Sequence, residues 1–346
     1  MKALRKHEAA FGLVVADVPE PTPGPGEALV EVEAAGICGS DLHVYEWTAG
    51  YEWMAPLMPL TLGHEFAGTV VALGPGADGP AVGTRVTVAP SYGGGRCAYC
   101  RAGIEDHCTC RQTVGLRQDG GFARLVRVPA RQCLTLPDGL DMEIAALSEP
   151  LAVGANAVRV AGVGRGETVV ILGPGPIGLA VLRFARLAGC EEAIVVGMGD
   201  TVRLDLAERL GASRTFDLAA VPRDAVVEAV MQATAGLGAH HVFEATGVAD
   251  SINDGLALVR YGGIVTAVGI HARPLHLPLT DFVRQRKQLR GAHGSNRAAW
   301  SWVMDAFPQH DAMLAALITH RFALDDGIAG FEAARGRGSG KVLLKP

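Results

Sequence analysis

The pattern of apolar and polar residues changes character near Gly154. Before that point, short apolar segments such as 28–32 and 69–73 are separated by turns rich in proline and glycine, which is typical of β-strands. Beyond it, short apolar runs alternate with stretches whose apolar residues recur at helical spacing. This alternation predicts βα units on a parallel sheet. The chain therefore reads as an α/β protein with a β-rich domain and a doubly wound domain.

The pattern also predicts where the elements of the second domain lie. After an apolar run at 168–172, we expect strands at 193–196, 215–217, 242–245 and 264–268, and helices near 201–210, 222–235 and 249–260. Beyond Gly291 a helical segment is predicted at 297–318, followed by a final strand at 341–344. We therefore predict that residues 154–295 form a nucleotide-binding domain, inserted into a domain made of residues 1–153 and 296–346.

The segment 168–188 has the form strand, glycine turn, helix. In a dinucleotide-binding turn the first glycine permits the tight bend, the second lets a pyrophosphate approach the backbone, and the third lets helix and strand pack closely. The pyrophosphate then lies at the helix N-terminus. A plain glycine-rich turn is the alternative, and the strand before and helix after the turn favour nucleotide binding. The residues expected to bind the cofactor here are Gly173, Gly175, Pro176, Ile177 and Gly178.

Composition narrows the class of protein. The net charge of −5 over 346 residues gives no reason to expect a nucleic-acid partner. The N-terminus lacks a signal-peptide core, and no apolar run is long enough to cross a membrane. Four of the seven cysteines lie between positions 97 and 110, which favours metal binding in a reducing compartment over disulfides. We therefore expect a cytoplasmic protein with no membrane partner.

Three side chains near predicted strands have the chemistry of a catalytic zinc site. Cys38, His64 and Glu65 offer sulfur, nitrogen and oxygen, and Glu149 is a fourth candidate at the domain junction. Three protein ligands and one open position are typical of catalytic zinc. Spacing this wide cannot show that the four residues meet. Taken separately, the cysteine fits a core position, the histidine a turn and the glutamates a surface.

The motifs around these residues resemble those of a known family. The pattern Gly63-His64-Glu65-x-x-Gly68, the segment 36–41, the turn 173–178 and Ser148-Glu149-Pro150-Leu151 resemble, in order, the zinc-dependent alcohol dehydrogenases of the medium-chain dehydrogenase/reductase superfamily. The resemblance implies a GroES-like catalytic domain, a Rossmann domain and a homodimer or homotetramer. Segments 39–47 and 318–322 are similar to L-threonine 3-dehydrogenases, whereas 149–154 is more similar to sorbitol and polyol dehydrogenases.

The resemblance also implies a reaction. Zinc would polarise the hydroxyl of a small secondary alcohol, either a polyol, a cyclitol or an amino alcohol, and hydride would pass to a nicotinamide cofactor. Ser40 would take the hydroxyl proton and pass it through the cofactor ribose towards His43. L-threonine is the alternative substrate. A zinc-free quinone or enone reductase and a non-catalytic NADPH-binding protein are further alternatives, and the intact ligand set counts against both. The residues implied in catalysis are Cys38, Ser40, His43 and Glu65.

The second cysteine cluster departs from the family pattern. Cys97, Cys100 and Cys108 match three of the four ligands of the family's structural zinc, but the first ligand position is Gly94. Cys110 could take its place, because four thiolates would then be available. A metal-free lobe with reduced thiols is the alternative, and the sequence leaves the choice open.

The residues that distinguish NAD from NADP are also unusual. An acidic residue about 20 positions beyond the glycines normally binds the ribose 2′-hydroxyl of NAD. The corresponding residue is Met198, and Arg203 is near enough to pair with a 2′-phosphate, which favours NADP. Asp200 could instead serve NAD. Val268 and Gly269, at the end of the last strand of this domain, are further candidates for cofactor binding.

Overall fold

The computed structural model describes residues 1–307 and 311–346. The chain divides into two compact units, one made of Met1–Glu149 and Met304–Pro346 and the other of Pro150–Val303. The divisions fall inside α4 (Ser148–Ala161) and α10 (Arg297–Ala306), whereas our predicted domain limits are 153/154 and 295/296. Among the described residues, no helix has the length and apolar character needed to cross a bilayer.

The first unit is built from antiparallel sheets. Its largest sheet runs in the order β10-β6-β5-β3-β18-β17, with β9 also paired to β3, and the smaller sheets are β2-β1-β4 and β7-β8. A core centred on Phe66, Phe122 and Phe331 fills the unit. The strands are β1 (Lys2–Lys6), β2 (Val14–Asp17), β3 (Glu27–Gly36), β4 (Leu60–Thr61), β5 (Glu65–Leu73), β6 (Arg85–Val88), β7 (Ser91–Tyr92), β8 (Gln112–Thr113), β9 (Leu125–Pro129), β10 (Cys133–Thr135), β17 (Ile318–Ala323) and β18 (Lys341–Lys345).

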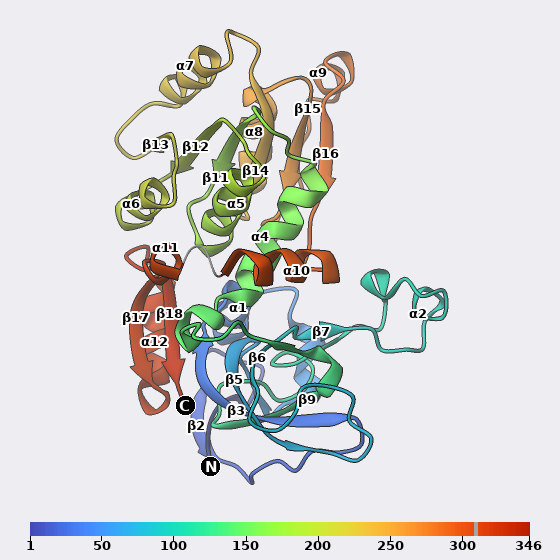
Figure 1. The fold of residues 1–346 in the computed structure, drawn as a ribbon. Helices are drawn as coiled ribbons and strands as arrows, with labels where there is room; N and C mark the ends of the chain where they lie inside the picture. Colours follow the sequence, from blue (N-terminus) through green and yellow to red (C-terminus); the bar gives the residue numbers. More distant parts are fainter. Residues whose placement is uncertain (308–310) are drawn as a thin grey trace. The chain divides into compact units, whose positions relative to one another are not determined.

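The helices of the first unit are short. A lobe containing α2 extends away from the sheets of the first unit, beyond β7 (Figure 1). The prediction of a helical segment at 297–318 is wrong at its end, because Ile318 already begins β17. Residues 308–310 of the predicted segment lie outside the described chain. The helices of this unit are α1 (Gly39–Glu46), α2 (Ala98–Arg101), α3 (Met142–Ala145), α11 (Asp311–Ala315) and α12 (Gly327–Arg335).

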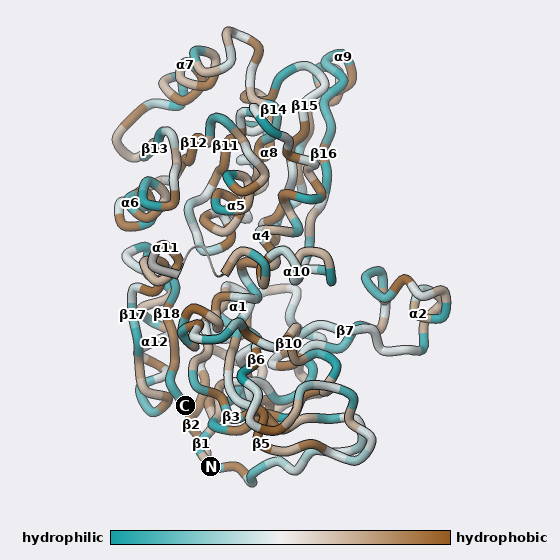
Figure 2. The backbone as a smooth tube through the Cα atoms, viewed as in Figure 1, coloured by the Kyte–Doolittle hydropathy of each residue, from teal (hydrophilic) through white to brown (hydrophobic). Residues whose placement is uncertain are grey.

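The second unit is a six-stranded parallel sheet in the order β13-β12-β11-β14-β15-β16. This is the strand order of a dinucleotide-binding fold, so the predicted doubly wound domain is confirmed. β11 (Thr168–Leu172) is buried along its whole length, and Figure 2 shows β11 and its neighbour β12 as mainly hydrophobic. The other elements are α5 (Pro176–Leu187), β12 (Glu192–Gly197), α6 (Thr201–Arg209), β13 (Arg214–Asp217), α7 (Arg223–Ala233), β14 (Ala239–Glu244), α8 (Ala249–Leu258), β15 (Val259–Ala267), α9 (Leu279–Arg284) and β16 (Gln288–Gly291).

Candidate active site

Strand pairing brings together three of the four predicted catalytic metal ligands. Cys38 follows the end of β3, whereas His64 and Glu65 lie at the start of β5. Because β3 and β5 are antiparallel and Gly36 pairs with Glu65, the end of one strand faces the start of the other. Ligand atoms of Cys38, His64 and Glu65 consequently lie within 4.8 Å of one another. Within the described chain this cluster does not include Glu149.

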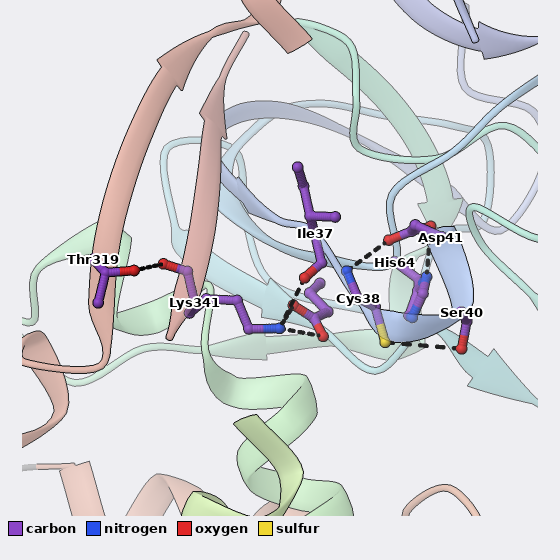
Figure 3. Close-up of polar contacts among 8 residues, drawn as sticks. Ile37, Cys38, Ser40, Asp41, His64, Thr319 and Lys341 are labelled. Atoms are coloured by element: carbon purple, nitrogen blue, oxygen red, sulfur yellow. Dashed lines mark hydrogen bonds and ion pairs between the residues drawn. The ribbon is translucent and has the colours of Figure 1, made fainter. Parts of the chain in front are cut away.

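A buried carboxylate that we did not predict orients two of these residues. Asp41, in the first turn of α1, has no exposed surface, and its Oδ2 accepts a hydrogen bond of 3.0 Å from the Cys38 backbone N–H (Figure 3). Its Oδ1 faces Nδ1 of His64 at 3.4 Å. A carboxylate behind one ring nitrogen leaves the other, Nε2, for a metal and is the usual support of a metal-binding histidine. Asp41 therefore holds the cysteine and the histidine in one arrangement.

Glu65 has a different partner, a lysine from the far end of the chain. Nζ of the buried Lys341, at the start of β18, donates to both carboxylate oxygens of Glu65, at 2.9 and 2.6 Å, and to the carbonyl oxygen of Ile37 at 3.1 Å. The carboxylate lies directly against Gly36, where a Cβ would be only 2.3 Å from Oε2. Both oxygens of Glu65 are thus held by a buried ammonium group. Glu149 is therefore the better candidate for the carboxylate ligand of a metal.

Glu149 belongs to the same electrostatic environment. It lies in the first turn of α4, where burial raises the pKa of its carboxyl to about 7. Glu65 and Asp41 also raise the pKa of Glu149, while His64 and Lys341 lower it. The carboxyl group therefore senses the charges of the cluster and, without a cation beside it, retains its proton to an unusually high pH.

Burial and the same neighbouring charges also shift the pKa values of Cys38 and His64. Burial, followed by Glu65, raises the pKa of the Cys38 thiol above its usual value, although His64 lowers it. Burial lowers the pKa of His64, but Asp41 and Cys38 outweigh it and raise this pKa well above the usual value. Groups that hold protons this tightly would release them to a divalent cation, because metal ligands bind deprotonated. One thiol, one imidazole and a carboxylate are donors that suit zinc, so the residues fit this metal.

The two predicted relay residues lie on a helix. Cys38 is the N-cap of α1, so Ser40 stands in its first turn with Oγ 3.8 Å from the Cys38 sulfur. His43 lies near its end, where Nδ1 contacts Oγ1 of Thr48 at 3.0 Å. The ring of Tyr51 stacks on the His43 ring with centroids 5.6 Å apart, and the Tyr51 hydroxyl is hydrogen-bonded to Ser40. Tyr51 therefore touches both relay residues.

The other aromatic residues of this region have separate roles. Tyr45 is buried in the core and donates its hydroxyl to Oε1 of Glu332 at 2.7 Å, so it is not available to a substrate. Trp53 is 40% exposed, and the guanidinium of Arg117 lies 4.2 Å from its ring centroid. The guanidinium group of Arg117, from a distant part of the chain, thus lies beside the segment 47–53, and the sequence did not reveal this contact.

The four clustered cysteines lie in one lobe as free thiols. Their sulfurs form a chain of contacts, with Cys97 to Cys100 at 3.6 Å, Cys97 to Cys108 at 3.8 Å and Cys108 to Cys110 at 3.6 Å. A Cβ built at Gly94 would lie 3.0 Å from the sulfur of Cys110. The thiol of Cys110 therefore lies beside the position where the missing ligand would begin.

The glycines of the predicted nucleotide turn occupy three different environments. Gly173 has a φ of +101°, and a Cβ there would lie 2.8 Å from Cγ2 of Thr246. A Cβ at Gly178 would meet the carbonyl oxygen of Gly173 at 1.9 Å, whereas one at Gly175 would have nothing within 4 Å. Gly175 is also the N-cap of α5 and offers no side-chain cap. Open space before uncapped N–H groups is what a pyrophosphate requires, so the turn fits a dinucleotide.

The acidic residue in the turn after β12 is engaged by other groups of the same turn. Met198 is 50% exposed, and its backbone N–H donates to Oδ2 of Asp200 at 2.9 Å. The other oxygen of Asp200 lies 3.4 Å from Nη1 of Arg203, and the residue is only 8% exposed. Both oxygens of Asp200 therefore have partners within its own turn. The predicted cofactor residues Val268 and Gly269 follow β15, and their N–H groups donate to the carbonyl oxygen of Glu244 at 2.8 and 3.0 Å.

A largely apolar cavity of about 190 Å³ opens near the carboxyl ends of β11 and β12. Ligands of doubly wound sheets bind outside the carboxyl ends of the strands, so an apolar recess here suits the flat face of a base. Its lining residues are Leu172, Val196, Leu218, Arg223, Val226, Val227, Asp254, Ala257 and Leu258.

Comparison with known proteins assigns the family. Residues 24–138 match the alcohol dehydrogenase GroES-like domain, and residues 176–309 match the zinc-binding dehydrogenase domain. The chain is 34% identical to a sorbitol dehydrogenase of Halalkalibacterium halodurans, over all of this chain and 99% of that protein. It is 33% identical to an L-threonine 3-dehydrogenase of Bacillus subtilis, again over all of this chain and 99% of that protein.

A solved structure agrees with both matches. A zinc-binding dehydrogenase of Sinorhizobium meliloti, bound to NADP, superposes with a TM-score of 0.89 at 34% identity, covering all of this chain and 99% of that one. The recognised motifs, the two-part fold and the donor set therefore agree, and the chain belongs to the zinc-binding dehydrogenases of the alcohol dehydrogenase family.

Proposed function

We propose that this dehydrogenase oxidises a small polar secondary alcohol, most naturally a polyol, with NADP as cofactor, and that Cys38, His64 and Glu149 hold its catalytic zinc. The observation that carries the ligand assignment is the buried Lys341, which holds both oxygens of Glu65. A carboxylate fixed in this way would have to exchange an ammonium partner for a metal. Lys341 acts on Glu149 only through its charge, which lowers the pKa of that carboxyl.

The side chains of the site then have distinct tasks. When bound, zinc supplies Lewis-acid polarisation of the substrate hydroxyl and the nicotinamide accepts hydride. Asp41 fixes the orientation of Cys38 and His64 through the two contacts of its carboxylate. Ser40 accepts the hydroxyl proton and His43 passes it towards solvent. Tyr51, which contacts both, keeps the serine hydroxyl and the histidine ring in place.

The preference for NADP rests on the turn after β12. Met198 cannot accept a hydrogen bond from a ribose 2′-hydroxyl, and the carboxylate of Asp200 is already engaged by Met198 and Arg203. Arg203 therefore offsets the charge of Asp200 in this turn and is the cation nearest to hand for a 2′-phosphate. Among relatives of known structure, one at 34% identity is bound to NADP and one at 26% identity is bound to NADH.

A polyol suits the chemistry of the segment around the relay. The ring of Tyr51 and the half-exposed Trp53 offer flat faces for C–H groups, and their polar atoms offer hydrogen bonds to hydroxyls. L-threonine is the second candidate, because Arg117 stacked on Trp53 supplies a cation that could meet a carboxylate. Steady-state kinetics on polyols and threonine will decide between them. A kcat/KM for threonine that exceeds every polyol by orders of magnitude would refute the polyol assignment.

The cysteine lobe supports a second, structural zinc. The chain of sulfur contacts from Cys97 to Cys110 provides four thiols, of which Cys97, Cys100 and Cys108 form the compact cluster and Cys110 lies beside Gly94. We therefore assign Cys110 as the replacement for the missing ligand. Closed sites of four thiolates stabilise folds without taking part in chemistry. Zinc analysis of purified protein tests this assignment, since about two ions per chain are expected and one would refute it.

A further inference from the structure

Glu244, the last residue of β14, has no exposed surface and no role in the mechanism described above. Its Oε1 accepts hydrogen bonds from the backbone N–H of Thr246 at 2.6 Å, the Thr246 hydroxyl at 2.5 Å and the backbone N–H of Gly247 at 3.0 Å. One carboxylate oxygen thus organises the whole turn between β14 and α8.

The second oxygen of Glu244 reaches the next loop of the sheet. Oε2 lies 2.8 Å from Nε2 of His271, which follows β15 and whose side chain is only 18% exposed. Neither atom makes a hydrogen bond within the described structure, so the two face each other as a close polar contact. The backbone carbonyl of the same glutamate accepts from Val268 and Gly269. Glu244 therefore joins the β14–α8 turn to the segment 268–271 through both its backbone and its side chain.

The two loops are packed so closely that glycine is required at the contact. A Cβ at Gly269 would lie 2.4 Å from the backbone nitrogen of Gly247 and 2.8 Å from Oε2 of Glu244. A Cβ at Gly247 would lie 2.8 Å from the carbonyl oxygen of Ile270. Because β14 and β15 are parallel neighbours, both loops stand at the carboxyl edge of the sheet, where dinucleotides bind. The apolar side chains of Val248 and Ile270 stand beside the contact and are 54% and 58% exposed.

We propose that His271, through its contact with Glu244, is a positioning residue that fixes segment 268–270 for the nicotinamide cofactor. The inference rests on the proposed function as a nicotinamide-dependent dehydrogenase and on the sequence-based prediction that Val268 and Gly269 bind the cofactor. A segment held against the neighbouring turn in advance need not be ordered when the cofactor binds, and pre-ordering of this kind raises affinity. Loss of the contact should therefore weaken cofactor binding while the alcohol KM changes little.

The test compares three variants of the full-length enzyme. His271→Leu removes the polar partner of Glu244, His271→Gln restores one, and His276→Leu changes an exposed histidine further along the same loop as a matched control. NADPH affinity, measured by fluorescence titration, should fall on the order of tenfold in His271→Leu, recover largely in His271→Gln and stay unchanged in His276→Leu. Equal affinity in His271→Leu and wild type, or equal losses in both leucine variants, would overturn the proposal.

A second measurement decides the contact without any cofactor. Backbone hydrogen exchange of ligand-free protein should accelerate at 246–248 in His271→Leu, although the substitution lies on the other loop, and should not do so in His276→Leu. Unchanged exchange at 246–248 would show that the histidine does not hold the turn and would refute the inference. A wild-type protein that bound neither NADPH nor NADH would instead refute the proposed function, and the exchange result would still decide the contact.

Discussion

Replacing Lys341 by methionine should be among the most destabilising single changes in the first unit. The ammonium group is 3% exposed and donates to three acceptors, and its partner Glu65 is fully buried. Burial lowers the pKa of Lys341, but Glu65 and Cys38 raise it above its usual value, so the group is charged at neutral pH. Removing one partner of a buried ion pair costs about 3–5 kcal/mol, because the other charge is left uncompensated.

The assay is native-state hydrogen exchange of the amides of β3 and β18, which reports the free energy of opening of this unit. Lys345→Met is the matched control, since Lys345 ends the same strand, is half-exposed and pairs with Glu143 at the surface. Exposed pairs contribute about 0–1 kcal/mol, so this variant should lose little. In the double variant Lys341→Met/Glu65→Gln both charges are gone, and much of the loss should be recovered.

Two results would refute this reasoning. One is a loss in Lys341→Met no larger than in Lys345→Met, which would mean that the buried ammonium group is not the counter-charge of Glu65. The other is a double variant whose loss equals the sum of the two single losses, because independent sites add and a coupled pair does not.

Three further predictions concern the metal, the cofactor and the lobe. In zinc-free protein the pKa values of Glu149 and His64 are raised by folding, so the stability should fall as the pH rises, from 4.5 to about 7 for Glu149 and above 6.5 for His64. Urea titrations at several pH values should show a much weaker dependence of stability on pH when zinc is bound. An equal dependence with and without zinc would contradict the ligand assignment. Met198→Asp should shift the ratio of kcat/KM values towards NAD by tenfold or more, about 1.4 kcal/mol, and a wild-type enzyme that already prefers NAD would refute our reading of the turn. Cys110→Ala should lose one zinc and several degrees of Tm together while keeping most of its kcat, and retention of both ions would exclude Cys110 as a ligand.

The sequence predicted those features that depend on local pattern. The nucleotide turn was recognisable because its glycines have different reasons to be there: backbone conformation at Gly173, close packing at Gly178 and open space for a ligand at Gly175. The strands and helices of the second unit were predictable because hydrophobic periodicity is also a local pattern. The clustering of Cys38 with His64 and Glu65 depends on the pairing of β3 with β5, which the family motifs implied and spacing alone could not establish.

The features that sequence analysis missed all depend on long-range packing. Lys341 is separated from Glu65 by 276 residues, and only the pairing of β18 with β3 brings its ammonium group to the site. Tyr45 lies only two residues after His43 in the sequence, but its side chain packs into the core. Asp41 lay within a recognised motif, yet its double contact with Cys38 and His64 has no signature in the sequence. Arg117 reaches Trp53 from a separate loop.

Zinc content measured together with turnover in wild-type enzyme and Cys38→Ser tests the central claim most directly. Protein purified without added metal and analysed by mass spectrometry should contain about two zinc ions per chain in the wild type and about one in Cys38→Ser. The variant should bind NADPH with wild-type affinity, because the cofactor residues lie in the second unit, and should show no alcohol-dependent reduction of NADP. A Cys38→Ser enzyme that kept full activity, or a wild-type enzyme that remained active with no zinc, would contradict the account.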